Sequence, residues 1–142
     1  MTESLRRILY LEDDPLIAEL ALMALEDSGR FTVRHCLLGQ EAIDVAAEFA
    51  PQLLLFDVML PDIDGLQTYF RINGQPACAG TPVVFMTAKG QRHQERAYLD
   101  LGACGVIVKP FDPLTLPDQL QAFWSAARSG EPTASPGIAR DG

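Results

Sequence analysis

Cysteine is scarce and scattered in this sequence. Its 142 residues include three cysteines, Cys36, Cys78 and Cys104, and none of them lies in a CxxC or CxxH spacing. An odd number of separated thiols indicates neither a disulfide framework nor a zinc site. We therefore expect reduced thiols in a protein of the cytoplasm.

Long apolar runs and an excess of positive charge are also missing. No run approaches the roughly 20 residues that a membrane-spanning helix needs, and residues 1–7 are largely polar, unlike a secretory signal. The net charge of −8 disfavours direct contact with a nucleic-acid backbone. We expect a cytoplasmic protein that binds neither a membrane nor nucleic acid directly.

A chain of this length fits one compact domain. The final segment, SGEPTASPGIARDG, is rich in Ser, Pro and Gly and has one aliphatic side chain larger than alanine. Such a segment buries too little apolar surface to order itself. We predict one domain over residues 1–128 and a flexible tail over residues 129–142.

Short apolar runs alternate with amphipathic segments along the domain. Strands are predicted at residues 8–11, 31–36, 53–56, 83–86 and 106–108, and helices from Pro15 up to Gly29, at 40–49, 91–101 and 116–127, with a further helix after the third strand. Apolar strands separated by helices indicate a parallel sheet that is covered on both faces. The predicted fold class is therefore doubly wound α/β.

Polar residues follow the predicted strands where each strand ends. They are Glu12, Asp13 and Asp14 after the first strand, Asp57 after the third, Thr87 after the fourth, and Lys109 with Pro110 after the fifth. In open α/β sheets, ligands bind outside the carboxyl ends of the strands. We expect these acids, the hydroxyl and the ammonium to meet in one crevice.

Magnesium is the metal that such a cluster of acids favours. Neighbouring carboxylates repel and raise each other's pKa unless a cation lies among them. Mg²⁺ prefers oxygen ligands and keeps waters that phosphate oxygens can replace. His35 and His93 have no partner at ligand spacing, so a structural or solvated role is favoured for both.

Asp57 is the best-placed nucleophile. It follows the apolar run LLLF and opens the loop VMLPDIDG, in which Pro61 stiffens the turn and Gly65 permits an unusual backbone conformation. A lone aspartate at a strand end is usually a helix cap, but the other polar strand ends favour a functional role. With a cation and Lys109 to neutralise phosphoryl oxygens, a carboxylate oxygen can attack phosphorus in line.

The chain resembles the receiver domain of bacterial two-component response regulators over about residues 6–128. The resemblance rests on four motifs that occur in order, LYLEDDP, DVMLPDIDG, VVFMTA and VIVKPF. It implies a flavodoxin-like fold whose five parallel strands follow the order 2-1-3-4-5, with helices on both faces. It also implies a stand-alone, single-domain response regulator that signals by docking to partners.

The same resemblance implies a metal site. Mg²⁺ would be held by the side chains of Asp13 and Asp57 and by the main-chain carbonyl of Met59, and Glu12 would support the metal through water. Met59 and Lys89 occupy positions that in this family tune the access of water to the phosphorylated aspartate.

The resemblance further implies how the phosphoryl group is handled. Thr87 would hydrogen-bond it, and Lys109 would pair with it next to a cis peptide bond before Pro110. The implied donor is a histidine kinase or a histidine phosphotransfer protein. The chain would be a phosphoacceptor that promotes its own phosphorylation and dephosphorylation, not an enzyme with a separate substrate.

One position departs from the family pattern. Output is expected on the face formed by the helix at 91–101, the strand at 106–108 and the last helix, where such receivers usually carry a switching aromatic. That position is Val106 here. A valine cannot swing a ring between buried and exposed states, so the usual coupling between the threonine and an aromatic cannot act through position 106.

Three other functions compete with phosphoryl acceptance. A phosphohydrolase with an aspartyl nucleophile needs a second acid, and Asp62 and Asp64 lie in the right loop but not at the DxD spacing. An interaction module without phosphorylation is favoured only by Val106. A flavin site would need a phosphate cradle of backbone amides where this chain is acidic.

Trp124 is favoured as a core residue, although an exposed indole there would suit partner binding.

Overall fold

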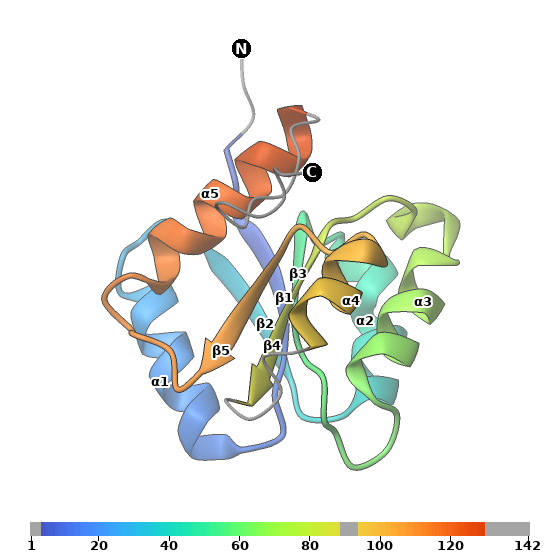
Figure 1. Cartoon of the computed structure of the whole chain (residues 1–142), viewed down its shortest axis with the longest axis horizontal. Helices are drawn as coiled ribbons and strands as arrows, with labels where there is room; N and C mark the ends of the chain where they lie inside the picture. Colours follow the sequence, from blue (N-terminus) through green and yellow to red (C-terminus); the bar gives the residue numbers. More distant parts are fainter. Residues whose placement is uncertain (1–3, 89–93, 130–142) are drawn as a thin grey trace.

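A five-stranded sheet forms the centre of the molecule (Figure 1). The computed structural model describes residues 4–88 and 94–129. All pairings are parallel, in the order β2-β1-β3-β4-β5. The strands are β1 (Arg7–Leu11), β2 (Thr32–Cys36), β3 (Leu53–Asp57), β4 (Val83–Ala88) and β5 (Gly105–Lys109). This is the fold class that the sequence predicts and the strand order that the family resemblance implies.

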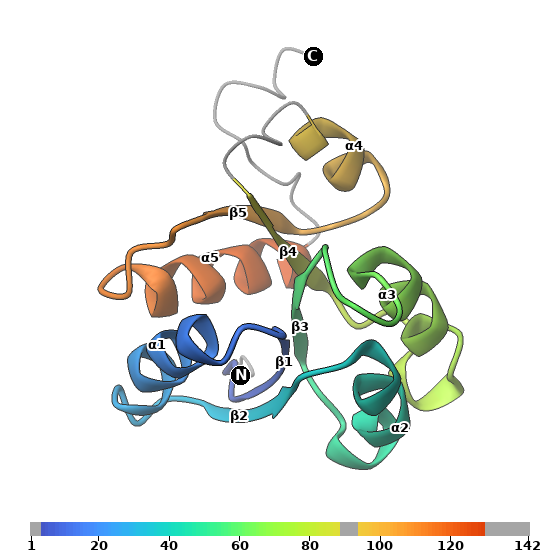
Figure 2. The same ribbon diagram turned by 90° about the horizontal axis from the view of Figure 1, so that it is seen from below.

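The helices cover both faces of the sheet (Figure 2). Helices α1 (Pro15–Glu26) and α5 (Leu116–Ser129) lie on one face, and α2 (Gly39–Phe49), α3 (Gly65–Asn73) and α4 (Glu95–Asp100) lie on the other. A single 3₁₀ turn, η1 (Pro76–Cys78), connects α3 to β4. Of the helices in the described ranges, none combines the length and the apolarity needed to cross a membrane.

The central strands are apolar on both sides because both sides face helices. Every residue of β3 is buried, whereas the edge strand β2 alternates exposed and partly covered residues. Two apolar clusters result. One contains Tyr10, Leu25 and Leu120 beneath α1 and α5, and the other contains Phe56 and Phe85 on the opposite face.

Trp124 belongs to the core, as the sequence favours. Its side chain is 3% exposed, it packs in the cluster beneath α1 and α5, and its indole Nε1 donates a hydrogen bond to the carbonyl oxygen of Gln52 at 3.2 Å. A buried Trp usually satisfies its N–H in this way. Trp124 is therefore unable to act as an exposed anchor for a partner.

Several element boundaries differ from the predicted ones. The first helix ends at Glu26, and the left-handed Gly29 (φ 72°) lies beyond its end instead of capping it directly. There the Gly29 amide donates to the Glu26 carbonyl, three positions back instead of four, and the Leu25 carbonyl accepts the Ser28 hydroxyl at 2.8 Å. The fourth helix is shorter than predicted, Glu95–Asp100. The predicted helix start at residues 91–93 and most of the predicted tail, residues 130–142, lie outside the described residues.

Candidate functional site

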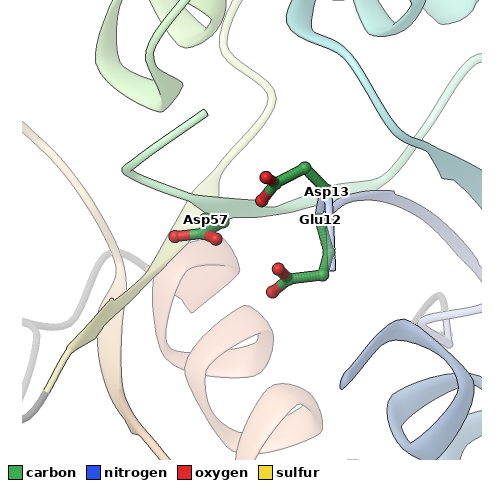
Figure 3. Close-up of side chains that lie close together, drawn as sticks. All are labelled: Glu12, Asp13 and Asp57. Atoms are coloured by element: carbon green, nitrogen blue, oxygen red, sulfur yellow. The ribbon is translucent and has the colours of Figure 1, made fainter. Parts of the chain in front are cut away.

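Three carboxylates meet at the carboxyl ends of β1 and β3. Glu12, Asp13 and Asp57 each present one oxygen within 4.8 Å of the others, and their side chains point toward a shared space (Figure 3). Glu12 and Asp57 are 1% and 4% exposed, whereas Asp13 is exposed. The structure thus brings together the acids that the sequence places at separate strand ends.

The backbone after Asp57 is held in a tight loop. The amide of Gly65, the first residue of α3, donates to the carbonyl oxygen of Val58 at 2.9 Å and closes the loop at its base. A Cβ atom on Gly65 would overlap the carbonyl oxygen of Asp57. The amide of Met59 donates to Asp57 Oδ1 at 3.2 Å. Residue 65 must therefore be glycine for Asp57 to keep this position.

Lys109, the last residue of β5, reaches across to both buried acids. Its Nζ lies 3.0 Å from Asp57 Oδ2 and 3.2 Å from Glu12 Oε1. The peptide bond between Lys109 and Pro110 is cis, as the family resemblance implies. One ammonium thus neutralises part of the charge of two buried carboxylates.

Thr87 lies near the end of β4, between the strands that carry Asp57 and Lys109. Its side chain is 1% exposed, and its hydroxyl has no hydrogen-bond partner among the described residues. Buried hydroxyls are nearly always paired. An unpaired hydroxyl at this edge of the sheet fits a site that binds an oxygen-rich group such as a phosphoryl group.

Burial and like charge shift the pKa values of the site. Desolvation of Glu12 and the neighbouring charge of Asp57 raise the pKa of Glu12 to about 7, although the Asp14 amide and Lys109 oppose the shift. Burial lowers the pKa of Lys109, but contacts with Asp57 and Glu12 outweigh burial and raise it. Lys109 is therefore charged at neutral pH, and the carboxyl of Glu12 titrates near neutral pH.

The chemistry of these donors fits magnesium. Glu12, Asp13 and Asp57 offer only carboxylate oxygens, the ligands that Mg²⁺ prefers. His35 lies beside the cluster, but its Nε2 is 2.9 Å from the main-chain oxygen of Glu12 and its ring packs against Tyr10. Its role is structural, as the sequence favours. His93 and Lys89 lie outside the described residues.

Three further aspartates near the site cap helices. Asp14 accepts the amides of Leu16 and Ile17 at the start of α1. Asp64 accepts the Gln67 amide at 2.8 Å at the start of α3. Asp62 accepts two amides of α2, a contact that sequence reasoning misses because its partners lie in another helix. Asp62 and Asp64 are thus engaged elsewhere, which removes support from the phosphohydrolase hypothesis.

Comparison with known proteins agrees with this geometry. The family model for the response regulator receiver domain matches residues 8–121. Two curated relatives are from Synechocystis sp. The DNA-binding dual master transcriptional regulator RpaA is 35% identical over 75% of this chain and 44% of its own length. Response regulator Rre1 is 33% identical over 82% of this chain and 48% of its own length. The chain thus spans about half the length of these relatives.

A solved structure supports the same fold. The chemotaxis protein CheY4 of Vibrio cholerae superposes with a TM-score of 0.76 and 26% identity. The match covers 84% of this chain and 99% of the CheY4 chain. The likeness therefore extends over nearly all of the CheY4 fold.

The raised pKa of Glu12 predicts how stability depends on pH in the metal-free protein. The carboxyl titrates near 4.5 in the unfolded chain and near 7 in the folded one, so within this window only the folded state keeps the proton. The free energy of unfolding should therefore fall as the pH rises, by up to about 3 kcal/mol. Urea unfolding in a chelating buffer across this pH range measures the slope.

The Glu12→Gln variant is the control for this pH dependence. It cannot lose a proton, so its free energy of unfolding should change less between pH 4.5 and 7 than that of the unmodified protein. Equal slopes for the two proteins would contradict the assignment of the raised pKa to Glu12.

The unpaired hydroxyl of Thr87 predicts an unusual effect on stability. Thr87→Val removes a buried donor that has no partner among the described residues, so the free energy of unfolding should stay the same or rise by about 1 kcal/mol. Thr68→Val is the matched control, because the Thr68 hydroxyl is equally buried but donates to the Asp64 carbonyl at 2.9 Å. That variant should be destabilised. Equal destabilisation of both would show that the Thr87 hydroxyl is already paired.

Proposed function

This chain belongs to the response regulator receiver domain family, and from that premise we propose that it accepts a phosphoryl group on Asp57. The observation that carries the proposal is the contact of Asp57 with Lys109 beside two further carboxylates. Buried like charges at the end of a sheet are costly. A site that gathers them is suited to a metal and a phosphoryl group.

The proposed metal ligands are Asp13, Asp57 and the main-chain carbonyl of Met59, with Glu12 acting through water. Asp13 is exposed, whereas Asp57 and Glu12 are buried, so the cluster extends from the protein surface inward to the nucleophile Asp57. When bound, Mg²⁺ supplies positive charge to the phosphoryl oxygens. The exposed side of the cluster leaves room for waters and for the incoming group.

The proposed reaction is an in-line transfer. A carboxylate oxygen of Asp57 forms a bond to phosphorus, and the bond between phosphorus and a histidine nitrogen of the donor breaks. Lys109 already touches Asp57 and would follow the charge onto the phosphoryl oxygens. The unpaired hydroxyl of Thr87 would donate to one of these oxygens. Hydrolysis of the acyl phosphate would restore the carboxylate.

The proposed donor is a histidine kinase or a histidine phosphotransfer protein, and we place the exchange in the cytoplasm.

We further propose that output uses the face formed by α4, β5 and α5. Val106 is partly covered there, and its side chain packs against the apolar cluster that contains Phe56 and Phe85. The ring of Phe123 from α5 lies against Gly105, where a Cβ atom would be 2.5 Å from the ring. An aromatic thus covers this strand from α5, not from position 106.

The alternative function is a docking module that is not phosphorylated. Val106 is the residue that favours it, because the usual switching aromatic is absent. The paired Asp57 and Lys109 and the unpaired Thr87 hydroxyl favour phosphoryl acceptance instead. Binding of DNA, which the name of RpaA states for that protein, is not proposed for this chain. The stand-alone, single-domain arrangement stays a prediction.

Incubation with acetyl phosphate and Mg²⁺, followed by intact-mass spectrometry, tests the proposal. The mass should rise by one phosphoryl group, and the gain should vanish with a chelator or in Asp57→Asn. Asp44→Asn, which removes a surface carboxylate on α2, should gain the group normally. Failure of the unmodified protein to gain mass under all conditions would contradict the proposal and favour the docking module.

A further inference from the structure

Helix α2 begins without a side-chain cap of its own. Its N-cap residue, Leu38, has no polar side chain and makes no capping hydrogen bond through its side chain. Asp62, in the loop between β3 and α3, supplies the missing acceptors. Its Oδ1 and Oδ2 lie 3.0 Å from the amide nitrogens of Gly39 and Gln40 respectively. One carboxylate thus satisfies two free amides of a helix that is remote in sequence.

The electrostatics of Asp62 agree with this contact. Asp62 is exposed, and although desolvation raises the pKa of its carboxyl, the hydrogen bonds from the amides of Gln40, Ile63 and Gly39 together outweigh desolvation and lower it. The carboxylate is therefore charged at neutral pH, and its negative charge is attracted to the positive end of the α2 dipole.

The first turn of α2 also lies directly against the same loop. Gly39 is buried, and a Cβ atom there would be 2.5 Å from Thr68 Oγ1 and 2.9 Å from the main-chain oxygen of Ile63. Such distances are too short for a side chain. Glycine at position 39 therefore allows the close approach, and Asp62 fixes it with two hydrogen bonds.

These contacts fix the far end of the loop that carries Met59. The near end is fixed by the Gly65 to Val58 hydrogen bond and by the Met59 amide on Asp57. Asp62 lies three positions after Met59 in the sequence. The direction of the Met59 carbonyl therefore depends on a short segment that is held at both ends.

We propose that Asp62 is a positioning residue, which caps α2 and thereby holds the Met59 carbonyl toward the acidic cluster. Asp62 does not touch the metal. Its loss lets the loop move, so that binding a divalent cation must first order the loop. The inference rests on the proposed function, because it assumes that Mg²⁺ binds beside Asp57.

The test is the affinity for Mg²⁺, measured by calorimetry in the absence of any phosphoryl donor. Asp62→Ala should bind about tenfold more weakly than the unmodified protein, as for other residues that orient a ligand. Asp62→Asn loses the same charge but keeps one acceptor oxygen, so its affinity should lie between the two. Asp44→Ala removes a carboxylate from α2 that accepts the side-chain amide of Gln40 and not the main-chain amides that bind Asp62, so this variant should bind normally.

A second variant disturbs the same contact between α2 and the loop after β3, but by a change in α2. Gly39→Ala should also weaken Mg²⁺ binding, because its methyl group pushes α2 away from Ile63 and Thr68. Combined with Asp62→Ala, it should add little further loss, since both remove one docking contact. Amide hydrogen exchange at Gly39 and Gln40 should be faster in Asp62→Ala, and circular dichroism shows that each variant is folded.

The outcomes separate this inference from the proposed function. If the unmodified protein binds no Mg²⁺, the proposed function itself fails. If it binds and Asp62→Ala binds equally well, Asp62 has no positioning role. If Asp62→Asn and Asp62→Ala are weakened to the same extent, the effect is one of charge alone and the inference is overturned. If Asp62→Ala does not fold, Asp62→Asn and Gly39→Ala decide in the same way.

Discussion

Two buried carboxylates at one edge of the sheet are the constraint on which the site depends. Glu12 and Asp57 are almost inaccessible to water, and an unpaired buried charge is strongly destabilising. The ammonium of Lys109 contacts both of them. Because one positive charge faces two negative ones, with exposed Asp13 beside them, the cluster keeps an excess of negative charge. Burial and this excess together raise the pKa of Glu12, and the excess is the feature that favours the proposed divalent cation.

The order of the strands makes this arrangement possible. Strands β1 and β3 are neighbours, so the acids that follow β1 meet Asp57 at the end of β3 directly. Lys109 comes from β5, which is separated from β3 by β4, and only a long side chain can span that distance. Thr87 lies on β4 within the gap, one position beyond Met86, which pairs with Asp57 in the sheet. Each side chain thus has the length that its strand position requires.

The sequence predicts this part of the molecule well because its signals are local. Apolar runs mark buried strands, and the carboxyl ends of parallel strands must share an edge. The acids, Thr87 and Lys109 could therefore be assigned to one edge of the sheet from the order of residues alone. The buried Trp124 also agrees with what the sequence favours.

Contacts between distant segments could not be predicted in this way. The oxygens of Asp62 bind amides that lie 22 and 23 positions earlier in the chain, and no local pattern connects the two segments. The packing of Phe123 on Gly105 likewise follows from how α5 lies on the sheet. Tertiary docking decides each of these features.

Identifying the phosphorylated residue most directly tests the claim that Asp57 is the phosphoacceptor. Protein treated with acetyl phosphate and Mg²⁺ is reduced with borohydride, which converts an aspartyl phosphate to homoserine, and digested for tandem mass spectrometry. The account predicts homoserine at position 57 and at no other aspartate. Homoserine at Asp13 or at another carboxylate, with none at position 57, would contradict the assignment of Asp57 as the phosphoacceptor.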